Sequence, residues 1–351
     1  MKHTTLKLAG MALAIAASAL TGRADVTLND NVSTYGYVSA LLGYTQYGNG
    51  VHSSTSLDVN AAKIGFAYNL APVTAKMSIY SSGHTLYLLE ANATYDIGQG
   101  LSITGGRFQS WLGYEPFDVP NANFITNGNL IANLIPNFHE GAKIEYAIDK
   151  KSTVGIAVVN SIYNGANAYA GDGSLSDGYG VEAHYGYNDG ALSIGAVAAY
   201  QNSRLYRVQQ AWKNAYIGDI WAQYIINNKT TLAAEFYYSR VIDTLRANFT
   251  GGKDNVYYGL ITAKQQFTDI FSLALRGSMG NDSTGDFMGL NLGNATTSSA
   301  NFWKVSLTPA CTVTKNLVVA GEISYQKYNK TWAGAGKDSN TFVGVLACFH
   351  F

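Results

Sequence analysis

The chain has 351 residues, and its 23 basic and 23 acidic side chains balance, so no net charge would recruit nucleic acid or an anionic surface. Charged residues make up 13% of the sequence, about half of the usual quarter for soluble globular domains. The 25 tyrosines and 37 glycines indicate many strands joined by tight turns. Two cysteines, Cys311 and Cys348, are too few for a disulfide scaffold.

Residues 1–24 predict a secretory signal peptide. Lys2 and Lys7 give a basic start, residues 8–20 are apolar, and small residues precede a cleavage point before Asp25. The apolar stretch of about 13 residues is shorter than the roughly 20 residues that a membrane-spanning helix requires. We therefore expect the mature chain, residues 25–351, to be a single exported domain.

From Asp25 onward, segments of about 9 to 15 residues alternate apolar and polar side chains without a helical period. Short connections alternate with mostly longer ones, which is typical of a bacterial outer-membrane barrel with periplasmic turns and external loops. The sequence thus predicts an all-β transmembrane antiparallel barrel. Its sixteen predicted strands are 32–47, 55–70, 73–81, 85–97, 100–112, 138–148, 152–163, 178–188, 190–201, 214–226, 230–242, 254–267, 271–281, 299–312, 316–328 and 339–351.

The third external loop, residues 113–137, contains three of the five prolines, Pro116, Pro120 and Pro136, so it can form neither a helix nor a ladder strand. A structureless segment this long is uncommon in a compact domain unless it is functional. We predict that the loop folds inward and narrows a pore. The alternative is a loop that lies outside, over the barrel mouth. Another predicted external loop, residues 243–253, places Gly251 and Lys253 at a loop tip.

Strand parity predicts which charges face a water-filled lumen, because a Lys or Arg that faces lipid near the midplane costs roughly 2 to 4 kcal/mol. Bases and acids are nearly equal in number among the charged residues predicted to face the lumen, which predicts weak ion selectivity of the pore. At the constriction, acids of the third loop would face basic wall residues across a narrow opening. The predicted constriction residues are Arg107, Glu115, Asp118, Lys143 and Glu145, and the predicted pore-lining residues are Lys63, Lys76, Glu90, Glu182, Asp219, Glu235, Lys264, Arg276, Lys304 and Glu322.

Aromatic residues of the loop, Tyr114, Phe117 and Phe124, are expected to pack it onto the wall, and the alternative is that they line a sugar track. The histidines show no metal-ligand spacing, and no nucleophile elbow occurs. Glu182 and His184 share one strand face and form the candidate acid-base pair. We expect no enzymatic activity, no cofactor and no metal site.

A short motif links the end of one strand to the opening of the third loop. The motif comprises Gly106-Arg107-Phe108, then Gly113-Tyr114-Glu115, with His139 and Gly141 leading the next strand. It resembles the putative beta-barrel porin-2 family, also called OmpL-like. The resemblance implies an outer-membrane channel of a Gram-negative-type bacterium. Lysine is common in that family where Arg107 stands here, and the charge is kept.

These observations predict an outer-membrane porin that passes small hydrophilic solutes and ions by diffusion. A channel specific for sugars or oligopeptides, and a plugged structural or adhesive barrel, are the alternatives. Barrels of this size resemble homotrimeric porins, and the expected surroundings are outer-membrane lipid and lipopolysaccharide. The last strand ends in the aromatic Phe351, which resembles the signal that the outer-membrane assembly machinery recognises.

Overall fold

The computed structural model describes residues 26–48, 53–82, 85–128, 137–162, 178–203, 214–246, 249–282, 300–332 and 337–351. The predicted signal peptide, residues 1–24, lies outside the described residues, as does the part of the third loop that contains Pro136. In the described part of the chain, no helix is long and apolar enough to cross a membrane.

The described chain is almost entirely β-strand, with one short 3-10 turn, η1 (Val119–Asn121), in the third loop. The strands are β1 (Val26–Asn29), β2 (Val32–Tyr47), β3 (Ser54–Leu70), β4 (Val73–Ser82), β5 (Thr85–Gly98), β6 (Leu101–Gln109), β7 (Phe138–Ala147), β8 (Ser152–Val159), β9 (Gly178–Asn188), β10 (Leu192–Ser203), β11 (Asn214–Asn227), β12 (Thr230–Arg246), β13 (Phe249–Gln266), β14 (Phe271–Asp282), β15 (Ala300–Thr314), β16 (Leu317–Trp332) and β17 (Lys337–His350).

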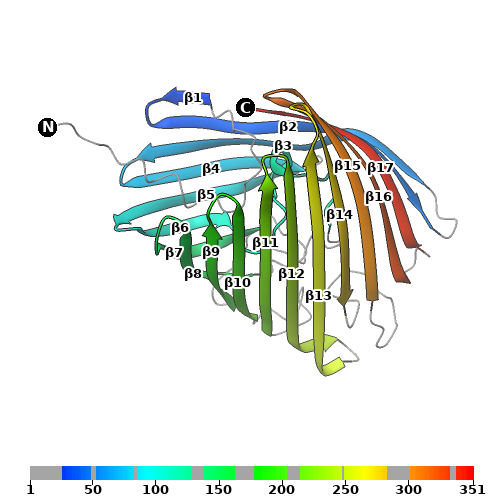
Figure 1. Cartoon of the computed structure of the whole chain (residues 1–351). Helices are drawn as coiled ribbons and strands as arrows, with labels where there is room; N and C mark the ends of the chain where they lie inside the picture. Colours follow the sequence, from blue (N-terminus) through cyan, green and yellow to red (C-terminus); the bar gives the residue numbers. More distant parts are fainter. Residues whose placement is uncertain are drawn as a thin grey trace.

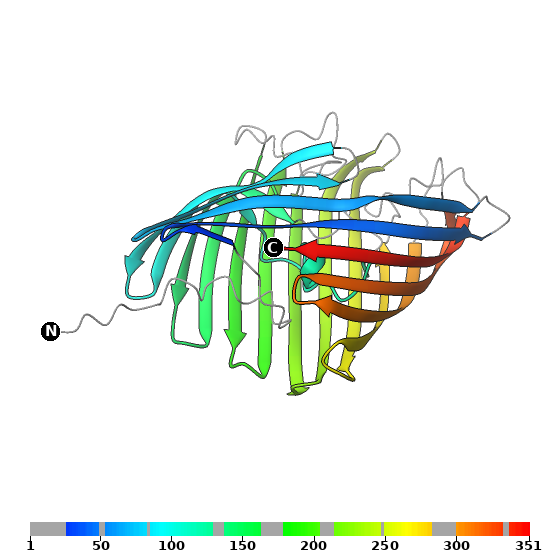
Figure 2. The same cartoon turned by 90° about the horizontal axis from the view of Figure 1, so that it is seen from above.

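Strands β2 to β17 form a closed antiparallel barrel. Each pairs with the next in sequence, and β17 pairs with β2 to close a ring of sixteen strands (Figures 1 and 2). The short β1 is an additional strand that pairs with β2. Because the ring of described strands β2 to β17 is closed, it has no first or last strand whose backbone N–H and C=O groups would face the bilayer without hydrogen-bond partners. The predicted sixteen-stranded barrel is confirmed, and most strand boundaries agree within a few residues.

One predicted loop is wrong. Residues 243–253 were expected to form an external loop, but β12 continues to Arg246 and β13 begins at Phe249. Gly251 and Lys253 therefore lie in a strand and not at a loop tip. The ladder between these two strands shifts register near its end, at Ile242 and Thr244, and such irregularities accommodate glycine and interrupt the alternation on which the prediction depended.

The two faces of the wall differ in chemistry, as a membrane barrel requires. On β12, the apolar Leu232 and Phe236 are exposed on the outer face, whereas Glu235 and Tyr237 are buried on the opposite, inner face. The cysteines lie on β15 and β17, with the whole of β16 between them, and both are free thiols.

Candidate pore constriction

The chain that leaves β6 binds the inner wall on β11 and β12. The backbone N–H of Gly113 donates to Asp219 Oδ2 at 2.7 Å, and the N–H of Tyr114 donates to Glu235 Oε1 at 2.9 Å. The Tyr114 hydroxyl donates to Gln223 at 3.0 Å. Burial raises the pKa of Tyr114 to about 12, so its hydroxyl stays a neutral donor. We call residues 113–128 the third-loop segment.

The same segment binds β3 through an ion pair. Lys63 Nζ lies 3.1 Å from each carboxylate oxygen of Asp118, and 3.1 Å from Glu90 of β5. The Lys63 side chain is only 4% exposed, so this attraction is weakly screened by salt. Next to it, the ring of Phe117 packs edge-on against Phe138 of β7, with ring centroids 5.1 Å apart. The prediction that Phe117 packs the loop onto the wall agrees with this contact.

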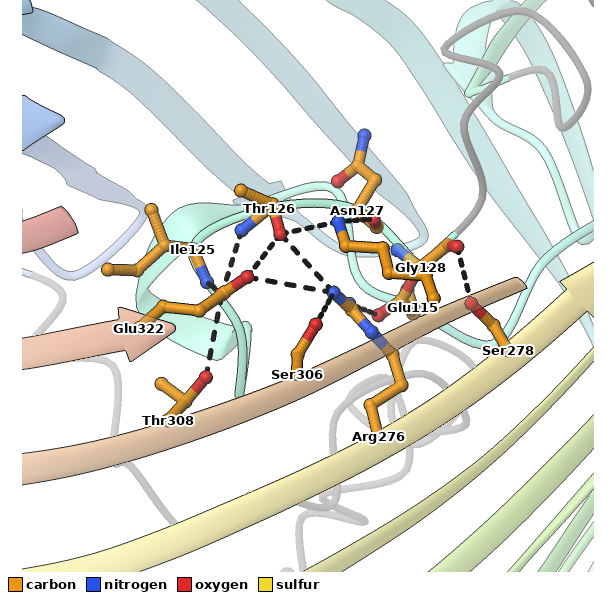
Figure 3. Close-up of polar contacts among 11 residues, drawn as sticks. Glu115, Ile125, Thr126, Asn127, Gly128, Arg276, Ser278, Ser306, Thr308 and Glu322 are labelled. Carbon is orange, nitrogen blue, oxygen red and sulfur yellow. Dashed lines mark hydrogen bonds and ion pairs between the residues drawn. The ribbon is translucent and has the colours of Figure 1, made fainter. Parts of the chain in front are cut away.

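Arg276 of β14 joins two parts of the third-loop segment (Figure 3). Its guanidinium donates to the carboxylate of Glu115, and it donates to the Thr126 hydroxyl at 3.3 Å and to Ser306 of β15 at 2.9 Å. The guanidinium carbon lies 4.2 Å from the centroid of the Phe124 ring, which is a cation–π contact. A buried arginine with several partners holds its neighbours in one geometry.

Glu322 of β16 binds the returning part of the segment (Figure 3). Its carboxylate accepts the backbone N–H of Ile125 at 2.6 Å and that of Thr126 at 3.1 Å, and the Thr126 hydroxyl also donates to it. Lys304 Nζ donates to the Thr126 hydroxyl at 2.6 Å and to the carbonyl of Asn127 at 2.7 Å. Charge-assisted hydrogen bonds of this kind are about twice as strong as neutral ones.

The two limbs of the segment are also tied to each other. Glu115, which binds Arg276, accepts the backbone N–H of Gly128 at 2.7 Å. The carbonyl of Gly128 in turn accepts the hydroxyl of Ser278 on β14 at 2.7 Å. The arrangement can fix a polypeptide segment against a wall, because carboxylates bind backbone N–H groups on both of its limbs.

The predicted opposition of charges across an open gap is revised. Glu115 and Asp118 are in direct contact with Arg276 and Lys63, because the chain brings each acid within hydrogen-bonding distance of its base. At these two positions the acid and the base form an ion pair and do not face each other across an opening.

The other predicted constriction residues lie in separate pairs. Arg107 Nη1 lies 3.0 Å from Glu140 Oε1, and its Nε donates to the carbonyl of Leu89. Lys143 pairs with Glu145 of the same strand at 2.9 Å.

Of the predicted pore-lining residues, Lys76 and Lys264 are half-buried. Each shares strand parity with a buried polar residue: Lys76 with Ser78, and Lys264 with Thr262. The contacts described above give positions for Lys63, Glu90, Asp219, Glu235, Arg276, Lys304 and Glu322.

Glu182 and His184, the candidate acid-base pair, have separate partners in the structure. Glu182 is hydrogen-bonded to His139, with Nε2 and Oε1 2.8 Å apart, while the ring of His184 stacks on Trp111 with centroids 5.0 Å apart. Both residues lie on the expected face of β9, and their partners, His139 and Trp111, come from the two sides of the third loop. Within the described ranges, no group of three or more His, Cys, Asp or Glu residues could hold a metal ion.

Several contact residues were not predicted. Ser278, Ser306 and Thr308 line the inner face beside Arg276 and Glu322. Their strand parity would have placed them on that face, but a neutral hydroxyl gives no signal that distinguishes a contact residue from one that only faces water.

A profile described as putative beta-barrel porin-2, OmpL-like, matches residues 57–351 of the chain. Among solved structures, the chain is similar to the trimer form of OmpT, an outer membrane protein of Vibrio cholerae, with a TM-score of 0.63, 12% identity, 92% of this chain and 100% of that chain covered. It is similar to the outer membrane channel DcaP of Acinetobacter baumannii, with a TM-score of 0.62 and 14% identity. The match covers 91% of this chain and 97% of the DcaP chain. It is also similar to OprB of Pseudomonas putida, with a TM-score of 0.66 and 14% identity. The match covers 92% of this chain and 94% of the OprB chain. No curated protein sequence matches the chain.

Proposed function

The chain belongs to the putative beta-barrel porin-2, OmpL-like family and is an outer-membrane porin, and we propose that small hydrophilic solutes and ions diffuse through it past a constriction formed by the third-loop segment. Sixteen strands are enough to enclose an aqueous channel. The protein acts in this proposal as a channel and not as an enzyme.

The observation that carries the proposal is that the segment binds opposite sides of the barrel. Gly113 binds Asp219 on β11, and Asp118 binds Lys63 on β3. These strands are eight positions apart, in either direction, in the ring of sixteen. A short stretch of chain that contacts the inner faces of two opposite strands supports a path across the lumen. The returning limb, on β14 to β16, would narrow the lumen further.

Assembly as a homotrimer is part of the proposal. The structure of OmpT to which the chain is similar is described as a trimer form, and the fold likeness is the support for the same assembly here. Each protomer would then contribute its own channel.

Single-channel conductance of the purified protein in a planar bilayer tests the proposed function. We would compare the wild type with Glu115→Ala and Asp118→Ala, and with Asp189→Ala, which removes an acid from the exposed turn between β9 and β10. We expect stable conductance steps whose size or ion preference changes in Glu115→Ala and Asp118→Ala but not in Asp189→Ala.

The outcomes separate the parts of the proposal. A silent bilayer with a correctly folded barrel would refute the channel. Steps that neither Glu115→Ala nor Asp118→Ala alters would keep the channel but remove the segment from it.

A further inference from the structure

The third loop begins and ends at one point on the wall. The N–H of Ser110, directly after β6, donates to the carbonyl of Asn137, directly before β7, at 2.9 Å. Both flanks also bind one carboxylate oxygen of β9: Glu182 Oε1 accepts the Ser110 hydroxyl at 3.1 Å and lies 2.8 Å from His139 Nε2. We call this group, Ser110, His139 and Glu182, the loop neck.

Two of the three side chains of the loop neck are closed to solvent. The side chains of His139 and Glu182 are both 0% exposed, and His139 Nδ1 lies 3.1 Å from the carbonyl of Ser161. A buried carboxylate with two hydrogen-bond partners is stabilised in place, whereas removing it leaves buried polar groups without a partner. Glu182 is therefore expected to hold one geometry.

The neck also sets the direction in which the chain leaves β6. The Ser110 hydroxyl accepts the N–H of Leu112 at 3.1 Å. Trp111, which lies between Ser110 and Leu112, stacks on His184. His184 shares the inner face of β9 with Glu182. The Trp111 and His184 planes differ by only 14°. Two side chains of β9, a strand that does not adjoin β6, thus hold Ser110 and Trp111, the two residues that directly follow β6.

From this geometry we infer that Glu182 is the positioning residue of the constriction: it holds both ends of the third loop and so keeps the third-loop segment directed across the lumen. Glu182 acts through the chain that it binds and not through its charge in the pore. The inference rests on the proposed function and adds to it the residue that maintains the constriction.

Two substitutions of Glu182 distinguish the effect of losing its hydrogen bonds from the effect of losing its charge. In Glu182→Gln, the side-chain amide can still pair with the Ser110 hydroxyl and with Nε2 of His139, whereas Glu182→Ala removes both contacts. We expect Glu182→Ala to increase the frequency of closing events and the open-channel noise several-fold in single-channel recordings, and Glu182→Gln to restore most of the wild-type behaviour. Ser110→Ala, which removes one donor, should give a smaller change in the same direction, and Ser110→Ala should add little to Glu182→Ala.

Folding is checked by heat-modifiable gel mobility, and only folded variants are recorded. The inference is overturned if Glu182→Ala is as quiet as the wild type, or if Glu182→Gln changes the recordings as much as Glu182→Ala does. If Glu115→Ala alters the recordings but Glu182→Ala does not, the neck fails and the constriction stands. If neither variant alters them, the constriction itself fails.

Discussion

Lys63 on β3 and Asp219 on β11 bind the two ends of one short stretch of the third loop, although their strands lie on opposite sides of the barrel. Lys63 binds the side chain of Asp118, whereas Asp219 binds the backbone of Gly113. The first contact depends on the identity of the loop residue and the second does not. Substitutions in the loop should therefore affect the two anchors differently.

Lys63 should matter more for stability than its partner Asp118. Lys63→Met removes the cation that Glu90 and Asp118 share in a buried site, and breaking a buried ion pair in this way costs about 3 to 5 kcal/mol. Asp118→Asn leaves Lys63 paired with Glu90 and should cost clearly less. Unfolding of both variants in detergent micelles, followed by circular dichroism, measures the two free energies. Equal losses would contradict the shared role of Lys63.

Arg276 should not tolerate replacement by lysine. The guanidinium reaches Glu115, Thr126 and Ser306 at once, and an ammonium cannot reproduce this fork of donors. We expect Arg276→Lys to alter channel conductance nearly as much as Arg276→Met, with both variants folded. Single-channel recording checks this, and wild-type conductance in Arg276→Lys would mean that charge alone suffices.

Gly195 of β10 provides space for the indole of Trp221, its cross-strand partner on β11. A Cβ atom at Gly195 would lie 2.4 Å from the indole ring, so the ring must move. We expect Gly195→Ala to destabilise the barrel by about 1 to 3 kcal/mol and to shift the tryptophan emission. The matched control is Gly218→Ala on β11, where an added Cβ has no atom within 4 Å. An equal loss in both variants would rule out the contact with Trp221 as the cause.

The turn between β9 and β10 should show a pH-dependent contribution from Asp189. Backbone N–H groups of Leu192 and Ala191 donate to its carboxylate at 2.9 and 3.1 Å and hold its pKa below the usual value. The carboxylate is therefore stabilising above its unfolded-state pKa of about 3.9, and this contribution is lost as the pH falls through the lower folded-state value.

Asp189→Asn keeps the acceptor oxygen but removes the charge. The wild type should be more stable than this variant at pH 7, and the difference should shrink at pH 3. Urea unfolding at the two pH values measures it. A difference that grows on acidification would show the opposite sign and contradict the assignment.

The barrel could be predicted from the sequence alone, because a strand in a membrane wall alternates apolar residues that face lipid with polar residues that face the lumen. That alternation placed Arg276 and Glu322 on one face and counted sixteen strands. It failed at residues 243–253, where shifts in register interrupt the period.

The contact partners of these side chains could not be predicted from the sequence and follow from the folded structure. Glu115 and Arg276 are 161 positions apart, and Ile125 and Glu322 are 197 apart. Parity along a strand says which way a side chain points, but not what it meets across the barrel. Those contacts exist because β17 pairs with β2 and closes the ring, which brings distant strands around one short segment. Glu182 likewise pairs with Ser110 and His139 and not with His184 of its own strand, because the successive pairing of β6, β7, β8 and β9 brings these residues together.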